Sequence, residues 1–187
     1  MKVNYLTSTL LSLMLLLSGD LAADEANLED KIKASYLYNF TKFIAWPEIK
    51  GPAFNLCIFG NDPFGTAIVP IEKKTAFNKP IKVNRLDETE YLSGLASKID
   101  CHILYIGETS APQKIVDKLQ AYSNKASTLV IGDSLDTAVN GEIINFVNRD
   151  GKIKLQIHLQ AAKRTALKIS AKLLEIAELI QDTNDGQ

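Results

Sequence analysis

The sequence predicts an α/β fold: one domain with a mixed, mostly parallel sheet of about five or six strands flanked by helices, a C-terminal antiparallel hairpin and a final helix. Short apolar runs of strand type alternate with segments of helical periodicity, and most connections are long enough for crossovers between parallel strands. Asn148-Arg149-Asp150-Gly151 is the exception, because Asp-Gly between alternating apolar residues indicates a hairpin. The runs expected as strands are 54–59, 81–86, 101–106, 128–131, 142–147 and 152–158.

The first 23 residues predict a secretory signal peptide. Lys2 supplies a positive start, residues 6–17 are apolar except for Thr and Ser, and Ala22-Ala23 offers a cut before Asp24. The apolar run is too short to span a bilayer, which takes roughly 20 apolar residues. We therefore expect residues 24–187 to form one exported domain, with no lipid anchor because the residue directly after the cut is Asp24 and not a cysteine.

Charge and cysteine content limit the function classes. The 21 basic and 22 acidic residues leave a formal net charge of −1, so the composition indicates neither a nucleic-acid footprint nor a polybasic membrane surface. An exported protein normally meets no ATP or NAD pool and works among oxidants, so the two cysteines are read as a pair.

Two helices are expected early in the chain. The first carries apolar residues at three- and four-residue spacing and ends at Trp46-Pro47, because the residue before a proline avoids the helical region. Its expected apolar face is Leu28, Ile32, Tyr36, Phe40 and Phe43. Asp62-Pro63 is interpreted as an N-cap and first helical residue of a short helix that reaches Val69. A further helix is expected at about 112–122, and residues 182–187 as a frayed tail.

The C-terminal segment carries more apolar surface than one buried helical face needs. One face of a single helix would hold Ala162, Ala166, Ile169, Leu173, Ile176 and Ile180. Leu159, Leu167 and Leu174 fall off that face. The segment is therefore either wedged between two layers or partly in contact with a partner.

Two motifs resemble catalytic loops, and the residues around them argue for structural roles. Gly60 and Gly65 have the spacing of a phosphate-binding loop, but the lysine is missing, and Asp62 would oppose the phosphates. The block 132–135, Gly-Asp-Ser-Leu, spells the nucleophile motif of the GDSL esterases. Its serine, Ser134, needs a base in an Asp-x-x-His arrangement, whereas the residue three before His158 is leucine. A capped turn is the preferred interpretation of both loops.

The sequence offers few residues that could bind a metal ion. His102 and His158 are the only histidines, and neither lies in a zinc-binding spacing. A metal site through Cys57, Cys101 and His102 is the alternative to a disulfide, which the oxidising compartment favours. With no cofactor motif either, the chain is interpreted as a binding module.

Several blocks, in order from about residue 31 to 177, resemble the YfiR family. The first-helix block is Lys33-Ala34-Ser35-Tyr36-Leu37-Tyr38-Asn39-Phe40-Thr41-Lys42-Phe43-Ile44-Ala45-Trp46-Pro47, and the later blocks are Leu56 to Gly60, Asp62 to Gly65, Cys101 to Gly107, Leu129 to Ser134, Gly141 to Phe146, and Ala161 to Leu174. The sequence departs from the family pattern at Asn140, His158 and Ala166. Ala166 replaces a common glycine, so it stays open whether the last segment is one helix, or a short helix, a kink and a second helix capped by Ser170.

The resemblance implies a non-enzymatic periplasmic repressor. Family members are similar to the repressor that binds the periplasmic sensor part of a membrane diguanylate cyclase, and an OmpA-like outer-membrane lipoprotein can sequester that repressor. The implied output is control of cyclic di-GMP and biofilm formation. Two alternatives remain: a periplasmic esterase that uses Ser134, and a small-molecule receptor with its crevice at the carboxyl ends of the parallel strands.

Two expectations concern specific residues. Cys57 and Cys101 lie in or at the start of neighbouring core strands, which can bring their α carbons within disulfide range. Leu159, Ile169 and Leu174 are the candidates for partner contact, with Ala162, Ala166, Leu173 and Ile176 assigned to the core. The sequence leaves the partner surface, a homodimer and any small ligand open.

Overall fold

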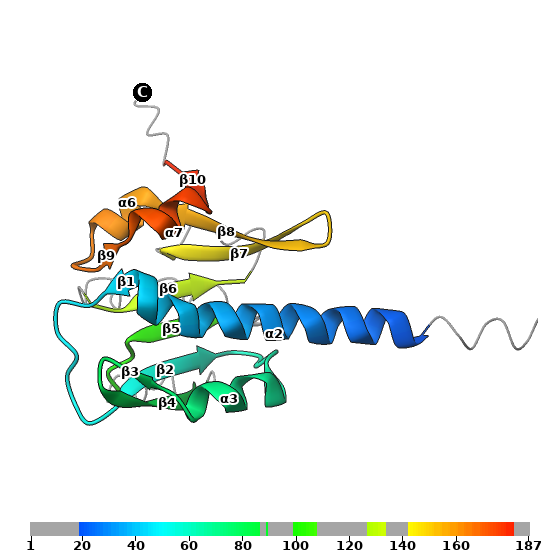
Figure 1. The fold of residues 1–187 in the computed structure, drawn as a ribbon, viewed down its shortest axis with the longest axis horizontal. Coiled ribbons are helices and arrows are strands. Elements are labelled where there is room, and N and C mark those ends of the chain that lie inside the picture. The colour runs from blue at the N-terminus through cyan, green and yellow to red at the C-terminus, as the bar shows by residue number, and fades with distance from the viewer. Residues whose placement is uncertain (1–18, 87–88, 90–98, 108–126, 134–141, 182–187) are drawn as a thin grey trace, which may run out of the picture.

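An eight-stranded mixed sheet forms the centre of the fold, in the order β10-β8-β7-β6-β5-β2-β4-β3 (Figure 1). The computed structural model describes residues 19–86, 89, 99–107, 127–133 and 142–181. The strands are β2 (Phe54–Phe59), β3 (Thr75–Ala76), β4 (Lys79–Leu86), β5 (Ile103–Ile106), β6 (Leu129–Gly132), β7 (Ile144–Arg149), β8 (Lys152–His158) and β10 (Glu178–Ile180). The predicted fold class, a mixed α/β sheet flanked by helices, is confirmed.

The six inner strands of this sheet are the six runs predicted from the sequence. Strands β7, β6, β5, β2 and β4 are parallel neighbours, whereas β7 and β8 form the predicted antiparallel hairpin. The hairpin turn places Asp150 and Gly151 at φ 54° and 71°, which the Asp-Gly pair tolerates. Two short edge strands, β3 and β10, raise the number to eight, above the five or six expected.

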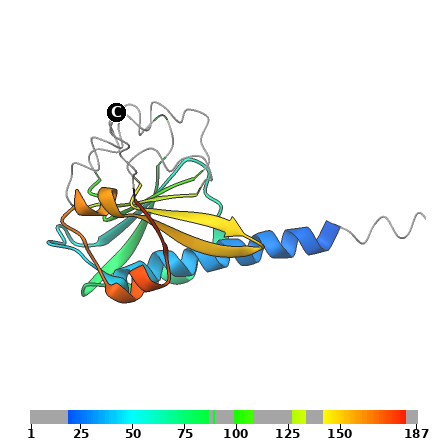
Figure 2. The same cartoon turned by 90° about the horizontal axis from the view of Figure 1, so that it is seen from above.

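The first helix, α2 (Gly19–Phe43), covers one face of the sheet with α7 (Figure 2). It ends just before Trp46-Pro47, as predicted, and its buried stripe includes Ala34, Leu37 and Phe40. The predicted face is wrong at its start, because Leu28 and Ile32 are 57% and 37% exposed. The face that packs on the sheet runs instead through Lys33, Leu37 and Phe40, because Lys33 is bound to Asp133 at the end of β6, and this rotation leaves Leu28 and Ile32 outside the contact.

The helix also runs through the end of the predicted signal peptide. Residues 19–23 form the first part of α2, so a cut after Ala23 would leave the mature helix beginning at Asp24. The cut itself stays a prediction.

The short helix after β2 begins later than predicted. The Asp62 carboxylate accepts a hydrogen bond from the Phe64 backbone N–H at 2.8 Å and closes a local turn. Gly65 follows at φ 46°, a left-handed conformation that an α-helix cannot include. A 3₁₀ turn, η1 (Gly65–Ile68), and α3 (Val69–Glu72) form instead, with Pro70 in the first turn. The helix expected at 112–122 lies outside the described residues.

The C-terminal segment is kinked, so of the two arrangements that the sequence left open, a short helix, a kink and a second helix capped by Ser170 is the one observed. The second helix ends at Glu175, and residues 178–180 form a strand. It forms α6 (Leu159–Lys163), β9 (Lys168–Ile169), α7 (Ala171–Glu175) and then the edge strand β10. Ser170 caps α7, because its hydroxyl accepts a hydrogen bond from the Leu173 N–H at 3.4 Å. Strand β9 pairs antiparallel with β1 (Ile44–Ala45), and β10 pairs parallel with β8. These pairings replace helical hydrogen bonds.

A buried ion pair fastens α2 to the sheet. Lys33 is 7% exposed, and its Nζ lies 2.7 Å from both carboxylate oxygens of Asp133 and 2.6 Å from a Glu29 oxygen. Asp133 directly follows β6 and also accepts a 2.5 Å hydrogen bond from the Tyr105 hydroxyl on β5. Burial by itself would lower the pKa of Lys33, but hydrogen bonds and charges from Asp133 and Glu29 outweigh it and raise the pKa. The ammonium group therefore stays charged.

Lys33→Met should reduce the free energy of unfolding by about 3 kcal/mol, because it leaves the Asp133 carboxylate without its buried partner. Urea denaturation followed by circular dichroism measures the change. Lys31→Met is the matched control, since Lys31 is exposed on the same helix turn, and should stay within about 0.5 kcal/mol of the parent. Equal effects of the two substitutions would contradict a special role for Lys33.

Candidate functional site

The predicted contact residues of the C-terminal segment are only half-buried. Leu159, Ile169 and Leu174 all pack against the main core cluster while keeping part of their surface accessible. Each lies on a different short element or beside one: Leu159 opens α6, Ile169 belongs to β9 and Leu174 to α7. The structure therefore gives these residues a packing role in addition to any role in partner contact.

The largest apolar exposure in this segment lies just beyond α7. Ile176 is 62% exposed and Leu179, on β10, is 47% exposed. The assignment of Ile176 and Ala166 to the core is wrong, because both are exposed, whereas Leu167 is buried at 8%. The reason is the break between α6 and α7, which rotates the residues after it out of the predicted helical face.

Strand β10 forms one edge of the sheet, and its acidic residue is compensated locally. The Glu178 carboxylate accepts hydrogen bonds from Gln156 at 3.1 Å and from the Arg149 guanidinium at 3.2 Å. The hydrogen bond from Gln156, followed by the charge of Arg149, lowers the pKa of Glu178. Ile176 and Leu179 therefore lie beside a carboxylate whose negative charge is balanced by Arg149, at the edge of the sheet. This position suits contact with an apolar protein surface.

The carboxyl ends of the parallel strands hold the motif that resembled an esterase. Asp133 of the Gly-Asp-Ser-Leu block is engaged by Lys33 and Tyr105, and Ser134 lies outside the described residues. Burial, followed by the charge of Asp133, raises the pKa of Tyr105, so its hydroxyl stays protonated and donates. His158 lies level with Val130, because Val130 O accepts from Ile143 N and Ile143 O accepts from His158 N. His158 therefore lies three residues back along β6 from Asp133.

A cavity of about 370 Å³ lies at the opposite end of the parallel strands, at the amino ends of β5 and β6. Its lining is Pro47, Glu48, Lys50, Asp100, Cys101, His102, Ser127 and Thr128. The receptor hypothesis had placed a crevice at the carboxyl ends, where the described residues instead hold the Lys33–Asp133 pair. Side chains of both charges take part in this lining.

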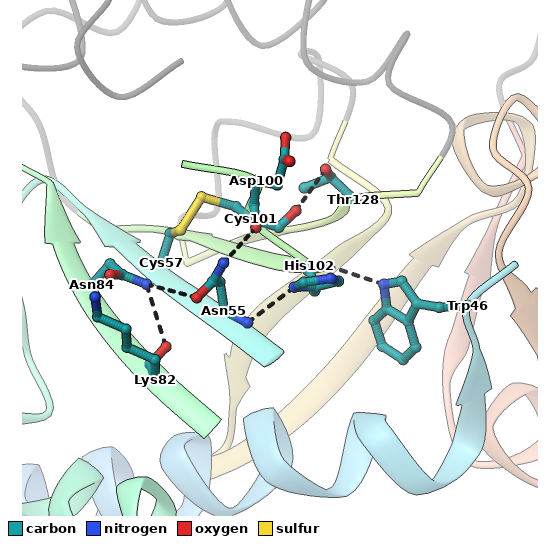
Figure 3. The surroundings of a disulfide bond; sticks show 9 residues. All are labelled: Trp46, Asn55, Cys57, Lys82, Asn84, Asp100, Cys101, His102 and Thr128. Atoms are coloured by element: carbon teal, nitrogen blue, oxygen red, sulfur yellow. Dashed lines mark hydrogen bonds between the residues drawn. A yellow bond between two sulfur atoms is a disulfide. The ribbon is translucent and has the colours of Figure 1, made fainter. Parts of the chain in front are cut away.

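A disulfide between Cys57 and Cys101 lies beside this cavity (Figure 3). It links β2 to the residue two positions before β5, and the two α carbons are 5.8 Å apart. Next to it, His102 accepts a hydrogen bond from the Asn55 N–H through Nδ1, at 2.9 Å, and stacks on Phe54. Burial lowers the pKa of His102, so the ring stays neutral at neutral pH. Both sulfur atoms are used in the disulfide, and within the described ranges we find no cluster of three or more residues suited to a metal ion.

The described helices include none that is long and apolar enough to cross a membrane. The comparison that decides the family is a match of residues 30–178 to a family model described as YfiR/HmsC-like. The chain belongs to the YfiR/HmsC-like family. The match begins within α2 and ends at the first residue of β10, so it includes all strands of the sheet apart from the end of β10. No curated protein matches the chain.

The YfiR/HmsC-like family is a periplasmic regulator family, which agrees with a binding role. The sequence reasoning missed Ile176 and Leu179 as exposed residues of this member. Ser170 gave the available signal: if it caps a helix of ordinary short length, Ile176 falls beyond the end of that helix. No pattern in residues 178–180 marks them as a strand, because three residues are too few to show alternation.

We expect the disulfide to be quantitative in protein purified from the periplasm. Intact mass under non-reducing conditions should show no thiol available for alkylation, even after unfolding. Replacing both cysteines by alanine should cost at most about 4 kcal/mol in the free energy of unfolding, since the bond closes a separation of 44 residues. Two alkylated cysteines per chain would show that the pairing is wrong.

Ser134→Ala should leave every measurable property of the protein unchanged, including its rate of ester hydrolysis. A serine hydroxyl without a base is nearly inert at neutral pH. Hydrolysis of short p-nitrophenyl acyl esters measures the rate, with buffer as the reference. Turnover above buffer that disappears in the alanine variant would support the esterase hypothesis instead.

Proposed function

We propose that this chain is a non-enzymatic periplasmic regulator that binds the periplasmic sensor part of an inner-membrane diguanylate cyclase and represses it. Repression lowers cyclic di-GMP and, through it, biofilm formation. Membership of the YfiR/HmsC-like family over residues 30–178 is the observation that carries the proposal. The signal peptide predicted at residues 1–23 supports the periplasmic location.

The physical mechanism is a shift between two states of the sensor. A bound repressor lowers cyclase activity only by the difference between its affinities for the inactive and the active sensor state. A hundredfold preference corresponds to about 2.7 kcal/mol, which a few well-buried apolar contacts supply. Cyclic di-GMP is made on the cytoplasmic side and takes no part in this contact.

The contact surface we propose is the end of the C-terminal segment. Ile176 and Leu179 are its exposed anchors, and the half-buried Leu159, Ile169 and Leu174 support them or join the contact. Hot spots are usually large side chains surrounded by polar groups, and Arg149, Gln156 and Glu178 supply such a rim.

Relief of repression follows from competition. An OmpA-like outer-membrane lipoprotein that binds the same repressor would remove it from the cyclase by mass action. Self-association through the same apolar surface would act in the same direction. The lipoprotein comes from the family resemblance, whereas self-association is our own addition, and each needs only one apolar surface.

Ile176→Asp and Leu179→Asp should each weaken capture of the purified sensor part by at least about 30-fold, because truncation of a central anchor costs roughly 2 kcal/mol or more. Isothermal titration calorimetry with the full mature chain measures the affinity, and thermal unfolding shows whether each variant stays folded. Val69→Asp is the matched control, since Val69 is an apolar residue 40% exposed on α3, which packs near β4 at the other side of the sheet.

Unchanged affinity in folded Ile176 and Leu179 variants would remove this surface from consideration. An equal loss in the Val69 variant would show a nonspecific effect of the added charge. If the parent protein shows no binding to the sensor part, the proposed function is wrong.

A further inference from the structure

Two ammonium groups share one tyrosine ring at the end of α2. The Nζ atoms of Lys42 and Lys74 lie 4.5 Å and 5.0 Å from the centroid of the Tyr38 ring. Lys42 is in the last turn of α2 and Lys74 follows α3, so tertiary structure brings them together. Cation–π attraction favours each contact singly, but it leaves the two positive charges close to each other.

The fold adds three more lysines to this end of the molecule. Lys73 precedes Lys74, Lys168 lies on β9 opposite Ala45, and Lys172 is in the first turn of α7. The α7 cap lies directly against α2, because the Ser170 N–H donates to Phe43 O at 2.8 Å. Figure 1 shows β1, β9 and the end of α2 at one end of the molecule. We call Lys42, Lys73, Lys74, Lys168 and Lys172 the basic end.

None of these five exposed lysines is neutralised locally. No carboxylate among the described residues lies within 4.0 Å of any of their ammonium groups. Four acidic residues lie instead around Lys33, about 14 Å further back along α2. They are Glu29, Asp30, Asp62 and Asp133, and they lie close enough to act on one another's charge. Glu72 and Glu175 also lie near the basic end, but the described residues show no ion pair between them and these five lysines.

An exposed aromatic ring borders the basic end. Phe77 lies in the turn between β3 and β4, three residues after Lys74, and is 40% exposed. Its φ is 52° and that of Asn78 is 60°, left-handed values that a bulky residue adopts only at a cost. An edge-to-face contact with Trp46 and stacking on Phe54, at 5.5 Å and 5.6 Å between centroids, hold the ring there. The fold thus accepts an unfavourable turn with an aromatic side chain at its tip.

We propose that the basic end docks on an anionic phospholipid surface, with the lysines near the phosphates and Phe77 at the level of the headgroups. The proposal rests on the proposed function, which places the chain beside the inner membrane. Lysines spread over four segments of the chain suit a diffuse layer of phosphates, whereas bidentate recognition of a protein carboxylate favours arginine. A half-exposed aromatic ring next to lysines is typical of surfaces that bind the membrane interface.

Co-sedimentation with vesicles tests the proposal. The full mature chain should bind phosphatidylcholine vesicles containing about 30% phosphatidylglycerol, and binding should fall steeply with added salt. Vesicles of phosphatidylcholine alone should bind little. Lys42→Gln with Lys74→Gln should lower the partition coefficient by roughly 30-fold, because each lysine near an anionic surface contributes about a factor of five.

A matched control has the same change of charge elsewhere. Lys152→Gln with Lys154→Gln removes two exposed lysines from the β7–β8 hairpin and should change binding by less than about twofold. Trp46 is the single tryptophan of the chain and contacts Phe77. Brominated lipids should therefore quench its fluorescence more in the parent protein than in the Lys42/Lys74 variant.

Three outcomes would overturn the proposal: no binding to anionic vesicles at low salt, equal binding to neutral vesicles, or equal losses in the two lysine pairs. Capture of the isolated sensor part in the absence of vesicles separates this proposal from the proposed function. The Lys42/Lys74 variant should retain that capture, and Ile176→Asp should retain vesicle binding. If the Lys42/Lys74 variant loses capture and the parent ignores vesicles, the basic end contacts an acidic protein surface, and the lipid proposal is wrong.

Discussion

The ion pair between Lys33 and Asp133 is the constraint on which the placement of α2 depends. A buried ammonium group is costly unless its partners are fixed, so the helix can take only a position and rotation that bring Lys33 to the end of β6. That rotation turns Leu37 and Phe40 into the core and leaves Leu28 and Ile32 exposed. The spacing of apolar residues also permits a face that includes Leu28 and Ile32. The buried Lys33 selects the observed face instead, because its ammonium group must reach Asp133.

The position of α2 in turn fixes the C-terminal segment. The helix delivers Ile44 and Ala45 to a place where they pair with Lys168 and Ile169, and this two-residue pairing interrupts what would otherwise be a continuous helix. The interruption has two consequences at once. It brings the backbone of residues 168–170 against the end of α2, and it lets the chain leave α7 early, so that Ile176 stays exposed and β10 adds to the sheet edge.

The parts of the fold that the sequence could predict are those in which local and tertiary preferences agree. The inner strands are continuous apolar runs, the hairpin has its Asp-Gly turn, and the first helix ends at Trp46-Pro47. Strands β3 and β10 have two and three residues, so they exist only because a longer neighbour offers hydrogen bonds. The basic end could not be predicted from the sequence either. Lys42, Lys74 and Lys168 are far apart in the sequence, and a balanced composition says nothing about where charges gather in the fold.

The two proposed surfaces share one short element. Lys172 lies at the start of α7 and Ile176 directly after its end, a rise of about 6 Å along the helix axis. A chain docked through its basic end would therefore hold the edge strand β10 at a nearly constant height above the membrane, where the sensor of a membrane protein must also lie. Confinement to that layer raises the effective concentration of the repressor at the sensor without any new contact. An apolar surface of only two exposed anchors then suffices for repression, and it remains weak enough to be lost to a competitor.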